Sequence, residues 1–223
     1  NGTTADIYLV MAQTDREKKH KGITCFIVER DRAGFEPGLK EDKLGIRSSD
    51  TCSIGLTNVT VPPENILGEA GRGFNIAMEV LNGGRIGIAA QALGIAQGAF
   101  ERALEYSTQR KAFGKPIADL QAIQFKLAEM SVKIEASRLL ILRAATMKDN
   151  HVRFVKEAAQ AKLMASKTAV EVTLEAIQVH GGYGYVREYH VERMLRDAKI
   201  TEIYEGTSEI QHIVIARELI KSL

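Results

Sequence analysis

From residue 71 onward, apolar residues recur every three or four positions over long stretches, and this periodicity limits the folds open to the chain. Two such stripes run through Leu120, Ile123, Leu127, Met130, Ile134 and Ile141, and through Val155, Ala159, Leu163, Val170, Leu174 and Ile177. A helix of about 28 residues spans roughly 42 Å, which is too long for a compact mixed domain but usual in a helical bundle. Segments 71–109 and 207–222 complete four main helices, and we expect Asn82-Gly83-Gly84 to split the first of them in two.

The first 65 residues have a different pattern. Segments 7–12 and 22–28 are short runs of apolar and β-branched residues separated by a polar loop, and segment 53–61 alternates with period two before Pro62-Pro63. No helical pattern alternates with these strands, so a parallel Rossmann sheet is not expected. The sequence predicts an α+β, mostly α fold: a partial antiparallel β-barrel or sheet in residues 1–65, followed by an antiparallel four-helix bundle in residues 66–223.

Composition excludes several kinds of function. The 30 Lys and Arg residues nearly balance the 28 Asp and Glu residues, so no broad basic face for nucleic acid is expected. The five histidines lack ligand spacing, and no apolar run reaches 18 residues, so we expect neither a metal site nor a membrane span. Cys25 and Cys52 fall in or beside expected strands, and we expect them to be reduced thiols of an intracellular protein. A disulfide bond between them is the alternative.

Two glycine clusters resemble phosphate-binding loops. They are Gly68-x-x-Gly71-x-Gly73 and Gly181-Gly182-Tyr183-Gly184. Neither lies between a strand and a helix of a βαβ unit, so neither is a dinucleotide fingerprint. Turns and helix caps explain them better, and we expect Gly181-Gly182 to end the third long helix.

One carboxylate stands immediately before the last predicted helix. Glu205 precedes the flexible Gly206, and Ser208 with Gln211 has the spacing of a capping box. A carboxylate held at the mouth of a pocket could accept a proton from a polarised substrate. Taken alone, the commoner explanation is that Glu205 complements the positive end of the helix.

A basic cluster, residues 110–116, lies between two long helices. The guanidinium of Arg110 suits a pyrophosphate, and Phe113 could lie against a ring. A solvated loop with Phe113 tucked into the bundle is an equally good interpretation.

Five motifs in order give the chain a resemblance to a known family. They are residues 41–49 (EDKLGIRSS), 84–89 (GRIGIA), 110–114 (RKAFG), 178–182 (QVHGG) and 204–207 (YEGT). In this order and spacing they resemble the acyl-CoA dehydrogenases, nearest to the short-chain, butyryl type, over essentially the whole chain.

The resemblance implies FAD-dependent α,β-dehydrogenation of short-chain acyl-CoA thioesters to trans-2-enoyl-CoA. By motif match, Glu205 is the base that takes the α-proton while the β-hydrogen leaves as hydride to flavin N5. The backbone N–H of Glu205 would help to polarise the thioester carbonyl. In other branches of the family the base lies beside the Gly-Arg motif, where this chain has Gly83 and Gly84.

The other site residues implied by the resemblance form two sets. The FAD set is Arg110, Phe113, Gln121, Gln178, Val179, His180, Gly181, Gly182, Thr207, Ser208 and Glu209, of which Arg110, Phe113 and residues 178–182 would reach the FAD of a neighbouring subunit. The acyl-CoA set is Asn82, Gly83, Gly84, Arg85 and Gly206, with Asn82 standing where many members have Asp.

The resemblance also implies partners and a setting. We expect electron-transfer flavoprotein as electron acceptor, a homo-oligomer built as a dimer of dimers, and a bacterial cytoplasm or mitochondrial matrix. The family's N-terminal helical domain and the first half of its β domain have no counterpart here. We therefore expect a fragment that binds FAD weakly and turns over little alone.

Two other classes of function remain open from the sequence. A family member recruited to DNA alkylation protection would want a basic C-terminal surface, which the near-neutral charge opposes. A non-catalytic helical assembly or flavin-binding module is the second alternative.

Overall fold

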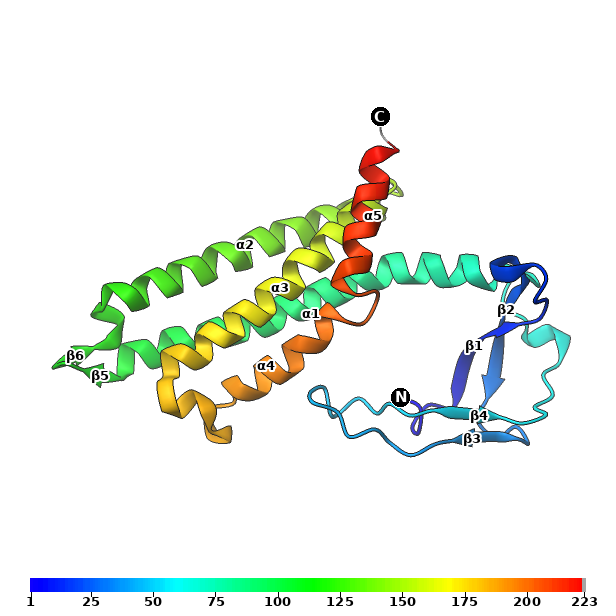
Figure 1. Ribbon diagram of the computed structural model, residues 1–223, viewed down its shortest axis with the longest axis horizontal. Coiled ribbons are helices and arrows are strands. Elements are labelled where there is room, and N and C mark those ends of the chain that lie inside the picture. Colours follow the sequence, from blue (N-terminus) through cyan, green and yellow to red (C-terminus); the bar gives the residue numbers. More distant parts are fainter. Residues whose placement is uncertain (222–223) are drawn as a thin grey trace. The chain divides into compact units, whose positions relative to one another are not determined.

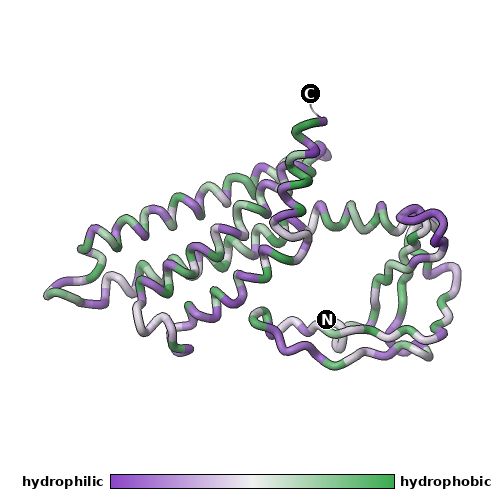
Figure 2. The backbone as a smooth tube through the Cα atoms, in the orientation of Figure 1, coloured by the Kyte–Doolittle hydropathy of each residue, from purple (hydrophilic) through white to green (hydrophobic). Residues whose placement is uncertain are grey.

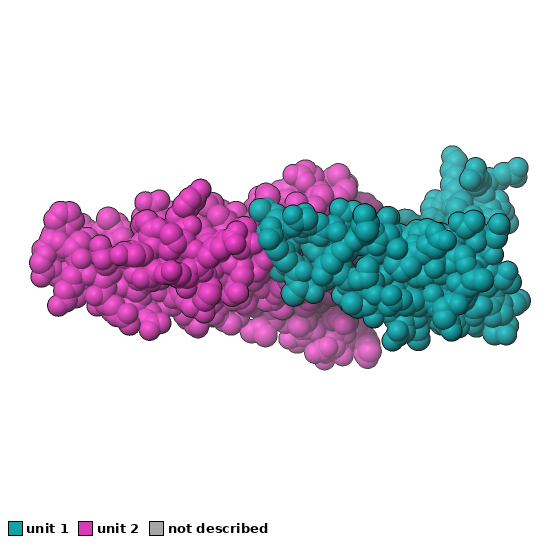
Figure 3. All heavy atoms as spheres, turned by 90° about the horizontal axis from the view of Figure 1, so that it is seen from below, with its two compact units in different colours: residues 1–81 teal, residues 82–223 magenta. Residues whose placement is uncertain are grey.

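The computed structural model describes residues 1–221. The chain divides into two compact units, Asn1–Leu81 and Asn82–Leu223 (Figure 3). The division falls inside the first long helix, whereas the sequence places a domain boundary near residue 65. Within the described residues, no helix combines the length and apolar character needed to cross a bilayer.

The N-terminal unit is built on short antiparallel pairs. Strand β1 (Ile7–Gln13) pairs with β2 (Ile23–Glu29), and β3 (Phe35–Pro37) pairs with β4 (Ile54–Leu56). The described residues form three separate two-stranded sheets, the third lying between two helices, and no closed barrel. The antiparallel region is thus confirmed, but the strand predicted for 53–61 is much shorter. Asn58 adopts a left-handed conformation with φ +51°, which ends the extended run despite its alternating pattern.

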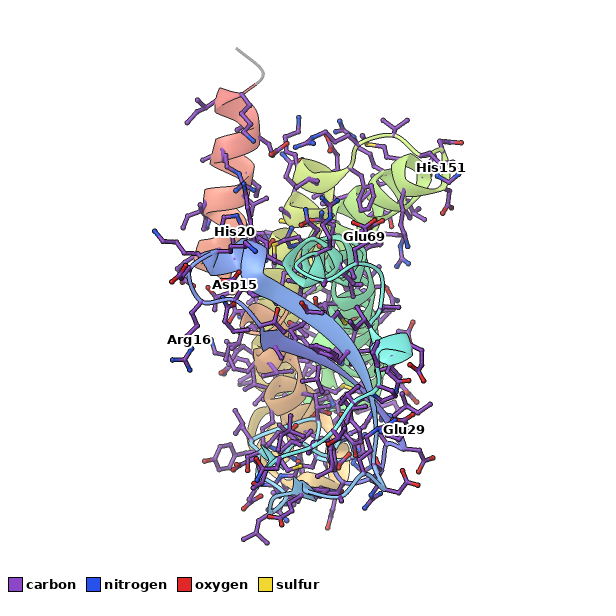
Figure 4. All side chains as sticks on the ribbon, turned by 90° about the vertical axis from the view of Figure 1, so that its right-hand side faces the viewer. Asp15, Arg16, His20, Glu29, Glu69 and His151 are labelled. Carbon is purple, nitrogen blue, oxygen red and sulfur yellow. The ribbon has the colours of Figure 1, made fainter. Side chains whose placement is uncertain are left out.

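Side-chain hydrogen bonds secure the loops of this unit. The β1–β2 loop carries Asp15, Arg16 and His20 (Figure 4), and the Asp15 carboxylate accepts bonds from the amides of Glu17 and Lys18. Cys25 is buried and Cys52 is half-buried, and both are free thiols, as the sequence predicted.

Five helices dominate the rest of the chain (Figure 1). They are α1 (Gly73–Gln109), α2 (Gln121–Asp149), α3 (Val155–His180), α4 (Val191–Lys199) and α5 (Ser208–Ile220). The predicted mostly helical fold with a bundle is confirmed. Gly181, with φ +59°, ends α3 as expected. The predicted break at Asn82-Gly83-Gly84 is wrong, because α1 runs through these residues as one helix.

The helical core is made mainly of small residues. On α1 these are Ala89, Ala92, Ala96, Ala99 and Ala103; on α3 they are Ala161, Ala165, Ala169, Val172 and Ala176. Such side chains let helices approach closely, and α3 contacts α2, α4 and α5. Hydrophobic and hydrophilic residues are interspersed along the long helices (Figure 2). Leu174, which the 3–4 spacing places in the buried stripe, is half exposed, because the core side of α3 follows the alanines instead.

Candidate functional site

Glu205 and Gly206 form a tight turn immediately before α5. Both have left-handed backbones, with φ +55° and +90°. At Gly206 a β-carbon would also lie 2.8 Å from Gln211 Nε2, so conformation and space both require glycine. The helix cap is Thr207, whose Oγ1 accepts from the Ile210 amide at 3.5 Å. The predicted capping box beginning at Ser208 is wrong, because Ser208 already belongs to the helix.

The Glu205 carboxylate is seated against the backbone of α1. A β-carbon at Gly84 would lie 2.6 Å from Glu205 Oε2 and 3.0 Å from its carboxyl carbon. Oε2 is buried and has no hydrogen-bond partner among the described residues. Glycine at position 84 therefore makes the room that this carboxylate occupies.

Arg85 supplies positive charge beside this seat. Its side chain is buried, and Nη1 donates to Asn82 Oδ1 at 2.7 Å, while Nε has no partner among the described residues. Burial lowers the pKa of Arg85, and the nearby Glu205 carboxylate opposes that shift. The α1 segment and the turn before α5, about 120 residues apart in sequence, thus bring Asn82, Gly84, Arg85 and Glu205 together.

Two buried polar residues donate hydrogen bonds to the backbone of the Glu205–Gly206 turn, and neither was assigned a site role from the sequence. Lys162 on α3 donates from Nζ to the Gly206 carbonyl at 2.9 Å, and Gln211 Nε2 donates to the same oxygen at 2.8 Å. Gln211 Nε2 also lies 3.1 Å from the Glu205 carbonyl. Both side chains are fully buried. A signal for Lys162 was available, because it takes a core position in the 3–4 repeat Ala158, Lys162, Ala165, Ala169.

A second group of predicted residues surrounds a pocket at the other end of α3. The pocket measures about 620 Å³, and its lining includes Tyr106, Arg110 and the segment 178–183. Gly181 and Gly182 are exposed, and a β-carbon at either would meet no atom within 4 Å. The Arg110 guanidinium lies 5.6 Å from the ring centre of Tyr183, which places a planar cation beside an aromatic face.

The side chains of Val179 and His180 face the protein interior. Val179 belongs to the helical core, and the His180 ring stacks on Tyr106 at 4.3 Å, with Nδ1 2.7 Å from the Ala176 carbonyl oxygen. Burial lowers the pKa of His180. A ligand in the pocket could therefore contact these two residues only through their backbone. Gln178, in contrast, is exposed and could offer its side chain.

Phe113 lies at the tip of a small hairpin between α1 and α2. Strands β5 (Lys111–Ala112) and β6 (Lys115–Pro116) flank it, and its ring is 91% exposed. The interpretation that Phe113 is tucked into the bundle is therefore wrong. Gln121 opens α2 and is also exposed.

The predicted residues thus form two separate groups within the helical unit. Lys162 and Gln178 are 16 residues apart on α3, which corresponds to about 24 Å. The first group joins Asn82, Gly83, Gly84 and Arg85 to residues 205–209, of which Glu209 is exposed. One chain does not bring Arg110, Phe113, Gln121 or residues 178–182 to Glu205. No set of three or more His, Cys, Asp or Glu in the described part of the chain is arranged to hold a metal ion.

Comparison with known proteins gives two matching family models. The model for the acyl-CoA dehydrogenase C-terminal domain matches residues 71–220, and that for the middle domain matches residues 1–59.

Individual relatives agree with these matches. A short-chain specific acyl-CoA dehydrogenase of Megasphaera elsdenii is 54% identical over 221 residues, covering 99% of this chain and 58% of the relative. Butyryl-CoA dehydrogenase from M. elsdenii superimposes with a TM-score of 0.97 at 54% identity, covering 99% of this chain and 57% of that one.

A third match comes from a structure described as the electron transferring flavoprotein of Acidaminococcus fermentans. Its TM-score is 0.98 at 49% identity, over 99% of this chain and 58% of that one. This chain spans a little over half the length of the curated relatives it matches. Two adjoining family models cover most of its residues in the family's order, and the chain belongs to the acyl-CoA dehydrogenase family.

Proposed function

We propose that the complete protein is an FAD-dependent dehydrogenase that converts short-chain acyl-CoA thioesters to trans-2-enoyl-CoA, with Glu205 as the base. The family membership and the short-chain specificity in the names of its relatives support this substrate class. We keep the proposed division into a β-domain portion, residues 1–65, and a helical domain, residues 66–223.

The observation that carries the proposal is the Glu205 carboxylate. Its Oε2 is buried beside Gly84 without a hydrogen-bond partner among the described residues, so a lone pair is free to accept a proton. A surface carboxylate that only complements a helix end would be hydrated instead. Buried, unpaired polar atoms are uncommon in proteins and often mark functional sites.

The residues present fit FAD at both groups. Near Glu205, Ser208 Oγ and Gln211 Oε1 are buried and unpartnered among the described residues, and the first turn of α5 has amides free to bind polar groups. At the other group, Arg110 and the open backbone of Gly181 and Gly182 suit a pyrophosphate. When bound, FAD supplies the two-electron acceptor for the hydrogen that leaves the β-carbon.

The chain's own residues would do the remaining work. Glu205 accepts the α-proton, and its backbone N–H polarises the thioester carbonyl, which acidifies the α-carbon. Asn82 and Arg85 flank the seat of Glu205 and would bind the acyl-CoA together with Gly83, Gly84 and Gly206. Arg110, Phe113, Gln121 and residues 178–182 lie too far along the bundle to join this site, so they would serve the FAD of a neighbouring subunit in a homo-oligomer, a dimer of dimers.

We further propose electron-transfer flavoprotein as the electron acceptor. The match to a structure described by that name supports this assignment. The bacterial and mitochondrial origins of the relatives support a bacterial cytoplasm or mitochondrial matrix as the compartment.

The variant Glu205→Gln in the complete protein tests the proposal. Butyryl-CoA should bleach the visible flavin absorbance of the wild type, and the variant should retain FAD but be reduced about 10²–10⁴-fold more slowly, which is the range that a general base contributes. Glu101→Gln, which alters an exposed carboxylate of α1, is the control. Unchanged reduction in Glu205→Gln would refute the assignment of the base. A wild type that binds FAD but is never reduced by acyl-CoA would favour the flavin-binding or assembly module.

A further inference from the structure

We propose that Lys162 is a positioning residue for the reaction, which holds the Glu205–Gly206 turn through the Gly206 carbonyl so that the Glu205 carboxylate faces its seat on α1. This inference rests on the proposed function, since it assigns Lys162 a role only if Glu205 is the base.

The first support is the burial and direction of the lysine. Lys162 is fully buried on a helix face made mainly of small residues, and its Nζ lies 2.9 Å from the Gly206 carbonyl oxygen. Burying an ammonium group is costly, and replacing a buried charge by an apolar side chain often stabilises a protein. The core of α3 therefore gives no reason for a lysine at this position, whereas the turn does.

The second support is the conformation of the turn. Glu205 is a non-glycine residue with φ +55°, a conformation that persists only where surrounding contacts enforce it. Gly206 continues in the left-handed region with φ +90°. Two donors, Lys162 Nζ and Gln211 Nε2, converge on the Gly206 carbonyl oxygen and fix the peptide group between Gly206 and Thr207, while Gln211 Nε2 also reaches the Glu205 carbonyl. Without them the backbone could relax and carry the carboxylate away from Gly84.

The third support is the charge around the turn. Lys162 is influenced by the negative charges of Glu202, Glu205 and Glu209 and by the positive charge of Arg85. Burial lowers its pKa to about 8, so the ammonium form still predominates at neutral pH. A charged donor makes a stronger hydrogen bond than a neutral one, which suits a residue that must hold a strained turn.

The test is Lys162→Met in the complete protein, with Lys167→Met as the matched control. Lys167 lies five residues further along α3 and is exposed. Misplacing a catalytic group by about 1 Å can lower a rate 100-fold, so we expect Lys162→Met to reduce flavin about 10- to 100-fold more slowly with saturating butyryl-CoA. FAD content should equal that of the wild type, and the dissociation constant for butyryl-CoA should change less than about threefold. The control should match the wild type in all three measurements.

Comparing the reduction rate per bound FAD with the thermal midpoint and FAD content distinguishes a positioning role of Lys162 from a structural one. A lysine needed only for folding would, when replaced, lower the thermal midpoint and FAD content but leave the rate per bound FAD intact. Positioning predicts the reverse: a slower rate per bound FAD, with a thermal midpoint that is unchanged or higher.

A second variant keeps the proposal testable if Lys162→Met does not fold. Gln211→Met removes the other donor to the Gly206 oxygen and should also slow reduction per bound FAD. Where both variants fold, the double variant should slow reduction by less than the product of the two single effects, because both side chains donate to the same oxygen. Wild-type rates in either folded variant, while Glu205→Gln abolishes reduction, would overturn the role of the turn's donors and leave the proposed function standing. Full reduction in Glu205→Gln would instead remove the proposed function.

Discussion

The two compact units use their polar side chains differently. In the N-terminal unit, carboxylates hold loop segments in place: buried Asp50 accepts bonds from Thr3 and Thr4 of another loop, and the partly exposed Glu29 on β2 accepts from Arg32 and Asn65. These bonds replace a large core, since the strands are short and several of their apolar side chains are exposed.

In the helical unit, some buried polar side chains also link helices, as Ser137 on α2 does with its Oγ 3.1 Å from Thr168 Oγ1 on α3. Among its largest fully buried side chains are Lys162 and Gln211, and both converge on the turn that carries Glu205. Polar side chains thus secure the fold in both units, and in the helical unit the two largest of the fully buried ones also hold the candidate site. The carboxylates of the N-terminal unit and the Lys162 ammonium carry opposite charge, so they titrate on opposite sides of neutral pH.

The largest effect we predict on stability lies on the alkaline side. The pKa of Lys162 falls from 10.5 to about 8 on folding, so between these pH values the unfolded chain binds a proton that the folded chain does not. Stability therefore rises with pH across this window as the cost of the buried ammonium disappears. The full cost below pH 8 is about 3 kcal/mol, taking about 1.4 kcal/mol for each pKa unit.

Chemical denaturation of the wild type and Lys162→Met at a series of pH values measures this cost. The advantage of the variant over the wild type should be greatest near pH 7 and should fall by about 3 kcal/mol towards pH 10.5. Taking the difference between the two proteins cancels the titration of the groups that do not interact with Lys162. An advantage that stays constant from pH 7 to 10.5 would mean that Lys162 keeps its ordinary pKa.

The next effect concerns the space beside Glu205. Gly84→Ala should slow flavin reduction by butyryl-CoA about tenfold or more, because the added β-carbon would stand 2.6 Å from Glu205 Oε2 and displace the carboxylate. The fold should not suffer, since alanine favours a helix over glycine by about 0.5–1 kcal/mol and the displaced atom ends a flexible side chain. Stopped-flow reduction and thermal unfolding of the complete protein measure the two effects.

Gly87→Ala on the same helix is the matched control. A β-carbon there would meet no atom within 4 Å, so the variant should gain helix stability and keep the wild-type rate. Equal rates in the two variants would show that Gly84 does not seat the carboxylate.

The difference between the units also explains which parts of the fold were predictable. Strands β1 and β2 and the long helices follow from local periodicity, which reports on the two faces of one element. The 3–4 spacing of apolar residues places Leu174 in the core of α3, whereas the packed side carries alanines, because close helix packing favours small side chains. The glycines at 83 and 84 predict a break in α1, whereas the helix is continuous and Gly84 makes room for a distant carboxylate.

The candidate site was predictable where motifs carry it. Glu205, Arg85 and residues 178–182 belong to short segments that resemble those of a known family. These segments do not show which of the residues lie together in the folded chain. Only the folded chain shows that Gly84 lies against Glu205, and that His180 and Val179 turn into the core. Lys162 belongs to no motif. Its position in an alanine repeat is explained only by the fold, which brings the Gly206 carbonyl within hydrogen-bond distance of its Nζ.

The smallest effect we predict lies on the acid side, in the N-terminal unit. Hydrogen bonds from Arg32 and then Asn65 lower the pKa of Glu29 from 4.5 to about 2. The unfolded chain therefore takes up a proton first as pH falls, and the stability from these bonds is present above pH 4.5 and lost toward pH 2. Because Glu29 is partly exposed, solvent screening makes this contribution small.

Amide hydrogen exchange of β1 and β2 should be faster in Glu29→Gln than in the wild type at pH 6, and the exchange rates of the two proteins should converge near pH 2. Glu36→Gln, at an exposed carboxylate of β3, should match the wild type throughout. A difference between Glu29→Gln and the wild type that persists unchanged at pH 2 would mean that the glutamine itself, rather than the lost charge, disturbs the loop.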